Sequence, residues 1–176
     1  MSPLFNAVTP GYFKTLGIPV IAGREFTAAD TGGRPKVAIV NEAFVNRFFG
    51  DRGALGRRVG FGGGPDTPLD IEIAGVTRDA KYQYMREDKQ PQIFIAARQN
   101  DFITEMNGYV RTRQEPEGLF AAVRSAVADI DRNVPIYGMR TLSEQMDQNL
   151  STERMIAFLA AAFGLLATAL AAIGLY

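Results

Sequence analysis

The sequence predicts an α+β fold in which helices pack on a mixed sheet, followed by one transmembrane helix. Short apolar strands and short amphipathic helices are interspersed before residue 140, whereas a doubly wound parallel sheet would have longer and more uniformly apolar strands. From Met155 to Tyr176 there is no charged residue, and about 20 apolar residues are enough to cross hydrocarbon as a helix. A folded domain with a membrane anchor is the expected organisation.

Composition excludes most common active-site chemistry. The chain has no cysteine and no histidine, which removes thiolate nucleophiles, disulfides, Ser-His-Asp triads and the usual zinc ligand sets. Its 19 basic and 19 acidic residues cancel and are mixed along the chain, so no basic stripe is available for a phosphate backbone. We therefore expect no catalytic residue, no metal or cofactor site, and no nucleic-acid partner.

Capping signals place a short helix near the N-terminus. Thr9 is suited to the N-cap, Pro10 to the first helical position and Gly17 to the residue after the C-cap. A brief extended run over 18–21 follows. The segment therefore predicts a two-turn helix and then a strand.

The next two elements are predicted to be a strand and a helix. Residues 36–40 are mostly apolar and rich in β-branched side chains, which is typical of a strand. Asn41 can cap the helix that follows, Phe44 and Phe48 share one face of it, and Gly50 ends the pattern.

Four further strands are expected in the same sheet. Residues 56–59 begin one, and the strand is interrupted by a glycine- and proline-rich hairpin loop over 60–70. Residues 71–76 alternate as a half-buried strand, and 92–96 and 106–110 supply two more.

An amphipathic helix is predicted to start at Pro116. Phe120, Val123, Val127 and Ile130 form its apolar face. This helix is expected to lie across the sheet.

A second helix begins at a capping box formed by Thr141 as N-cap and Glu144 three residues later. Leu142, Met146 and Leu150 share one face of it. If this helix continues without a break into Met155, it would couple the domain rigidly to the membrane.

The charge-free segment 155–176 is interpreted as the membrane span. A buried helix of a soluble protein is the alternative, but such helices rarely stay without a charge or a polar face for six turns. Small residues recur every fourth position at Ala160, Gly164, Thr168 and Ala172, a pattern on which another helix could approach closely.

These patterns divide the chain into three parts. Residues 1–140 are expected to form the folded domain, 141–154 a connecting amphipathic helix, and 155–176 the transmembrane helix. Any membrane partner depends on this predicted span, since it would place the domain at a lipid surface.

Seven short segments carry a recognisable pattern: 8–19, 23–26, 40–44, 47–49, 55–59, 73–79 and 140–142. Taken in order, they resemble the extracytoplasmic core of MacB-like ABC permeases, followed by the start of an FtsX-like permease domain. Within that family the chain looks most similar to the duplicated orphan permeases of acidobacteria. The resemblance extends over nearly the whole chain.

The resemblance implies a non-enzymatic part of an inner-membrane permease for export or mechanotransmission. Residues before about 154 would be periplasmic, and the full-length protein would cross the membrane several times. Implied partners are membrane lipid, other permease spans or a second permease copy, and a separate cytoplasmic ATPase. The resemblance implies no ATP site in this chain, and the sequence has no P-loop.

Two other functions compete with this interpretation. A membrane-tethered sensory domain would need a ligand pocket, for which Tyr82, Tyr84 and Arg111 are candidates. A hydrolase would need paired carboxylates, and the only clusters are Asp66, Asp70 and Glu72, and Glu25 and Asp30. Each cluster lies in or beside a polar loop where nothing desolvates it, which argues against catalysis.

Overall fold

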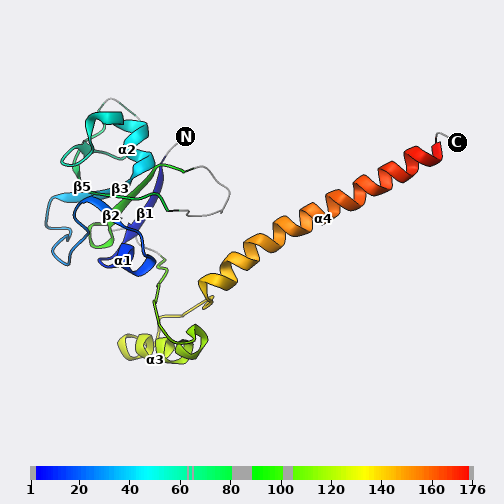
Figure 1. The fold of residues 1–176 in the computed structure, drawn as a ribbon. Helices are drawn as coiled ribbons and strands as arrows, with labels where there is room; N and C mark the ends of the chain where they lie inside the picture. Colours follow the sequence, from blue (N-terminus) through cyan, green and yellow to red (C-terminus); the bar gives the residue numbers. More distant parts are fainter. Residues whose placement is uncertain (1–2, 63, 65, 81–88, 101–104, 175–176) are drawn as a thin grey trace. The chain divides into compact units, whose positions relative to one another are not determined.

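The computed structural model describes all residues except 1–2, 63, 65, 81–88, 101–104 and 175–176. The chain forms two compact units, Met1–Arg111 and Thr112–Tyr176. The first unit contains the sheet and the second contains the two longest helices (Figure 1).

The described part of the first unit forms one mixed, six-stranded sheet. Its strands are β1 (Leu4–Val8), β2 (Val20–Gly23), β3 (Lys36–Asn41), β4 (Arg58–Val59), β5 (Ile71–Thr77) and β6 (Gln92–Ala96). The order is β1-β6-β3-β5-β2, with β4 also pairing with β5. The β1–β6 and β3–β5 pairs are parallel and the other pairs are antiparallel. The predicted mixed sheet is therefore confirmed.

Helices cover both faces of this sheet (Figure 1). The helix α1 (Tyr12–Leu16) places Phe13 in one apolar cluster, and α2 (Glu42–Phe48) places Phe44 in the other. Two single-turn 3-10 helices, η1 (Gly50–Arg52) and η2 (Ala97–Gln99), complete the first unit. A sheet covered on both faces needs apolar side chains on both.

Alternation along β3 supplies both clusters. Val37 and Ile39 belong to the cluster under α1, whereas Ala38 and Val40 belong to the cluster under α2. Successive side chains of a strand point to opposite faces, so one continuous apolar run can serve two layers. Burial of all four makes β3 the centre of the fold.

Asn41 joins three elements at the end of β3. Its Oδ1 accepts hydrogen bonds from the backbone N–H of Phe44 at 3.0 Å and of Gln92 at 2.8 Å, and its Nδ2 donates to the carbonyl of Gln90 at 2.8 Å. The side chain is 1% exposed. The predicted N-cap is confirmed, and the same side chain also fixes β6 against β3.

The N-terminal helix is confirmed, but its predicted N-cap is wrong. The cap is Gly11, at φ 89°, and Thr9 instead accepts a hydrogen bond from the N–H of Tyr12 through its carbonyl. Glu25 accepts the N–H of Gly11 at 2.9 Å, which holds this left-handed residue in place. Gly17 ends the helix at φ 72°, as predicted.

Two strand predictions need correction, and one strand was missed. Residues 106–110 have no regular secondary structure, and Met106 and Val110 are 69% and 64% exposed. The strand expected over 18–21 lies at Val20–Gly23, because Ile18 still hydrogen-bonds back to the carbonyl of Phe13. The strand β1 was not predicted; its short sequence is recognisable only once β6 is beside it.

The second unit consists of helices. Pro116 starts the 3-10 helix η3 (Pro116–Leu119), which leads into α3 (Phe120–Ile130), and α4 spans Leu142–Gly174. The predicted start at Pro116 is thus confirmed. Because α3 belongs to the second unit, the expectation that it lies on the sheet stays a prediction.

The long helix α4 begins at the predicted capping box. The N–H of Thr141 donates to Glu144 Oε2 at 2.7 Å, and the N–H of Glu144 donates to Thr141 Oγ1 at 3.1 Å. The helix then continues to Gly174 as one element. Among the described residues, no helix is sufficiently long and apolar to qualify as a membrane span.

Candidate functional site

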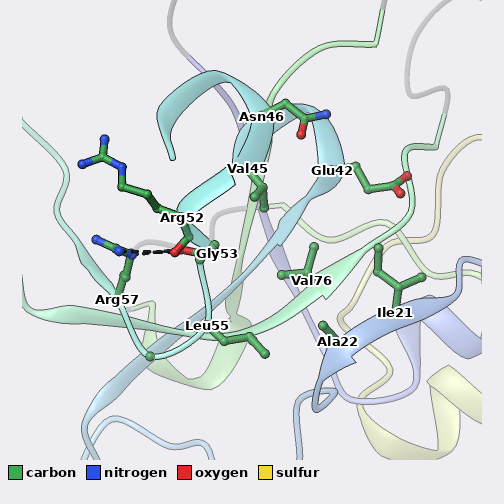
Figure 2. A pocket seen from close by; sticks show the side chains of 12 residues that line it. Ile21, Ala22, Glu42, Val45, Asn46, Arg52, Gly53, Leu55, Arg57 and Val76 are labelled. Carbon is green, nitrogen blue, oxygen red and sulfur yellow. Dashed lines mark hydrogen bonds between the residues drawn. The ribbon is translucent and has the colours of Figure 1, made fainter. Parts of the chain in front are cut away.

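A pocket of the first unit lies beside β2, α2 and the turn that follows α2 (Figure 2). Its volume is about 660 Å³. Strand β2 contributes Ile21 and Ala22, α2 contributes Val45, and β5 contributes Val76 from the floor. These four side chains are apolar, so they have no hydrogen-bonding group for a polar ligand.

Two arginines lie on one side of this pocket (Figure 2). Arg57 donates from Nε to the carbonyl of Gly53 at 2.9 Å and from Nη2 to the carbonyl of Arg52 at 3.3 Å. Its guanidinium also lies 5.5 Å from the ring centroid of Phe49. The backbone carbonyls of Arg52 and Gly53 therefore hold the guanidinium of Arg57 in place.

A carboxylate lies on the opposite side of the pocket, where Figure 2 shows Glu42. Its Oε2 accepts the N–H of Asp79 at 3.2 Å, and Asp79 Oδ1 in turn accepts the N–H of Ala43 at 2.9 Å. This reciprocal pair ties the first turn of α2 to the chain after β5. Lys89 lies 3.4 Å from Asp79 and offsets part of its charge.

The residues predicted to transmit motion and to pack in the membrane all belong to α4. Leu142 is 55% exposed, and the side chains of Met146 and Leu150 lie outside the described residues. Their role as a transmitting face stays a prediction.

Three of the four small residues of the predicted packing strip are described. Ala160, Gly164 and Thr168 are exposed, and the side chain of Ala172 lies outside the described residues. The hydroxyl of Thr168 donates to the carbonyl of Gly164 at 2.8 Å. The donor of this hydroxyl is thus used within the helix.

Residues 2–133 match the family of MacB-like periplasmic core domains. The chain belongs to this family. The match covers most of the chain, including all six strands and the pocket.

Two of the solved structures to which the chain shows similarity come from transporters. The periplasmic region of MacB from Actinobacillus actinomycetemcomitans has 14% identity and a TM-score of 0.49, with 70% of this chain and 55% of that chain covered. The extracellular domain of the noncanonic ABC-type transporter YknZ from Gram-positive bacteria has 20% identity and a TM-score of 0.49, with 73% and 63% covered. The MacB-like chain thus spans less than two thirds of either structure. No curated protein matches it.

Three of the five carboxylates considered for a hydrolase, Glu25, Asp30 and Asp70, are engaged in structural contacts in this MacB-like domain. Asp30 forms two hydrogen bonds of 2.8 Å with Arg24, and it also accepts the N–H of Thr27 at 2.7 Å. The hydrogen bond from Arg24 is the main reason that the pKa of Asp30 falls to about 2. Lys36, 2.7 Å away, lowers the pKa of Asp70. A general acid needs the opposite shift.

The sensory pocket expected around Tyr82, Tyr84 and Arg111 stays a prediction. Tyr82 and Tyr84 lie outside the described residues. Arg111 donates from Nη1 to the carbonyl of Lys14 at 3.5 Å, at the end of α1. The described residues also contain no group of three or more acidic side chains placed to hold a metal ion.

The pocket itself was not found by reasoning from the sequence. Its lining comes from four separate segments, and only their pairing in the sheet brings them together. One local signal was available: Gly53 and Gly56 lie between Arg52 and Arg57 and both have positive φ. Such a turn can present two arginines on one side.

Proposed function

We propose that the chain is the extracytoplasmic domain of an ABC-type transporter permease, attached to the membrane by residues 155–176 and acting in export or mechanotransmission. Membership of the MacB-like periplasmic core family supports the domain assignment. The charge-free sequence after Arg154 supports the attachment, although no described helix qualifies as a span. The same proposal includes the start of an FtsX-like domain and an affinity with duplicated acidobacterial permeases.

The observation that carries the mechanism is the single helix α4. It runs from Leu142 to Gly174, so it includes both the proposed connector, 141–154, and most of the proposed span. A continuous helix transmits displacement along its axis because its backbone hydrogen bonds resist bending. In this proposal a separate cytoplasmic ATPase moves the spans, and α4 carries the movement to the sheet-containing unit.

The topology can be tested by cysteine labelling, because the chain has no cysteine of its own. The full-length protein, with any cysteine outside these 176 residues replaced by serine, would carry one cysteine at Ser125, on α3, or one at Ala161, in the proposed span. A membrane-impermeant maleimide applied to intact spheroplasts should label Ser125→Cys and leave Ala161→Cys unlabelled. Equal labelling of both, or labelling of Ser125→Cys only after lysis, would contradict the proposed topology.

Coupling through α4 can be tested by inserting two glycines after Ser151. Glycine costs about 1 kcal/mol per helical position relative to alanine, so the insert should break the helix at that point. Complementation of a permease-deletion strain should be lost, whereas two inserted alanines keep the helix and serve as the control for length. Full activity of the glycine insert would refute the coupling role.

The predicted packing strip can be tested in the same complementation assay. The substitutions Gly164→Leu and Thr168→Leu should impair function if the strip contacts other spans or a second copy.

A further inference from the structure

We propose that the pocket beside β2 and α2 binds a small amphipathic anion, with its acidic group at Arg52 and Arg57 and its apolar body over Ile21 and Leu55. The lining lies entirely in the first unit. The inference therefore holds whether or not residues 155–176 cross a membrane.

The size and the exposed apolar surface favour a small organic ligand. A volume of about 660 Å³ lies within the roughly 300–1,000 Å³ typical of small-molecule sites. Ile21 and Leu55 are 45% and 46% exposed although they line a concave surface. Covering them with an apolar body would remove that surface from water, which is favourable.

The charge distribution favours an acidic group on that ligand. Arg57 uses two of its N–H groups on the carbonyls of Gly53 and Arg52, and a guanidinium has five. Within the described chain, neither Arg52 nor Arg57 forms an ion pair with a carboxylate. Two cations on one side, free of acidic partners and fixed in part by the backbone, suit a carboxylate, sulfonate or phosphate group.

Glu42 sets the orientation of the ligand. It lies on the side of the pocket opposite the arginines (Figure 2) and has one oxygen engaged by the N–H of Asp79. An acidic group at that side would be repelled, so the anion should face Arg52 and Arg57. An inorganic anion alone would leave the apolar wall uncovered, and a neutral hydrocarbon would leave the arginines without a counterion.

Anilinonaphthalene sulfonate is a direct probe, because it joins an apolar ring system to one anionic group and fluoresces when its rings leave water. Phenylnaphthylamine has the same rings without the sulfonate. Each would be titrated into the whole chain, in buffer where the chain is monodisperse without lipid and otherwise in detergent-free lipid nanodiscs, with buffer or empty nanodiscs as the blank. The sulfonate should bind at one saturable site, and the neutral compound should bind at least about tenfold more weakly, since charged hydrogen bonds are lost.

Arginine variants locate the acidic group. The double variant Arg52→Gln with Arg57→Gln should weaken binding of the sulfonate by about tenfold or more and leave the neutral compound unaffected. Arg47→Gln is the matched control, because Arg47 is an exposed arginine of α2 that does not line the pocket. Its affinity for the sulfonate should equal that of the unmodified chain.

A substitution in the apolar lining tests where the apolar body of the ligand binds. Ile21→Ser removes apolar wall at an exposed position, where unfolding is not expected, and should weaken binding of both compounds several-fold. Circular dichroism melting of every variant separates loss of binding from loss of fold. Inorganic sulfate at equal ionic strength should compete only weakly.

Three results would overturn the inference. One is an affinity for the sulfonate that is the same in the arginine double variant and in Arg47→Gln. The second is equal affinity for the sulfonate and for phenylnaphthylamine. The third is the absence of saturable binding to the folded, unmodified chain.

Discussion

Replacing Asn41 by alanine should destabilise the sheet-containing unit more than any surface change. Loss of the N-cap costs about 1 kcal/mol, and the buried N–H of Gln92 then lacks an acceptor, which costs about 1–3 kcal/mol. The carbonyl of Gln90 also loses its donor. We expect a total loss of about 3 kcal/mol in the free energy of unfolding.

Hydrogen exchange on the whole chain, followed by mass spectrometry, can measure this loss in peptides from β3 and β6. A loss of about 3 kcal/mol should speed the slowest amides about 100-fold. Asn41→Asp keeps both acceptor contacts, but it buries a charge and sets a carboxylate oxygen against the carbonyl of Gln90, so it should destabilise the unit as well. Asn46→Ala, on the exposed face of α2, should change exchange very little. If Asn41→Ala destabilised the unit by less than about 1 kcal/mol, the three-way role of Asn41 would be wrong.

Two further predictions concern backbone and charge in the first unit. Gly23→Ala should destabilise it by more than about 2 kcal/mol in a urea unfolding assay, since φ of Gly23 is 73° and a Cβ would overlap the carbonyl oxygen of Ala74. Gly33→Ala is the control and should be neutral, because a Cβ on Gly33 would meet open space. The low pKa of Asp30, about 2 in the folded state, contributes stability that is present above pH 4 and is lost as pH falls toward 2. The loss should be about 1–2 kcal/mol, because the half-exposed Arg24 is screened by solvent. A stability difference between the unmodified chain and Asp30→Asn that does not shrink over this pH range would contradict the assignment.

Local signals in the sequence were enough to predict much of the fold. The caps at Asn41 and Thr141 were predicted correctly because each depends on residues within three positions. The strands near 36–40, 71–76 and 92–96 were also predicted correctly, since their apolar patterns are strong.

The failures share a dependence on distant parts of the chain. Thr9 was the candidate for the N-cap that the local sequence offered. The cap is Gly11, whose N–H donates to the distant Glu25. Residues 106–110 pair with no strand in the described part of the chain, and they remain exposed. The pocket is the clearest case, because Arg57 meets the apolar residues of β2 only through the folded sheet.

Parallel pairing of β1 with β6 has a consequence for biosynthesis. Leu4 lies beside Gln92 and Val8 beside Ala96, so β1 has no ladder partner until nearly the whole unit that follows it has been synthesised. Such distant pairing forms late and slowly. Until then, the apolar residues of β1 are available to a holdase chaperone, and a nascent chain stalled before residue 92 could not complete this sheet edge.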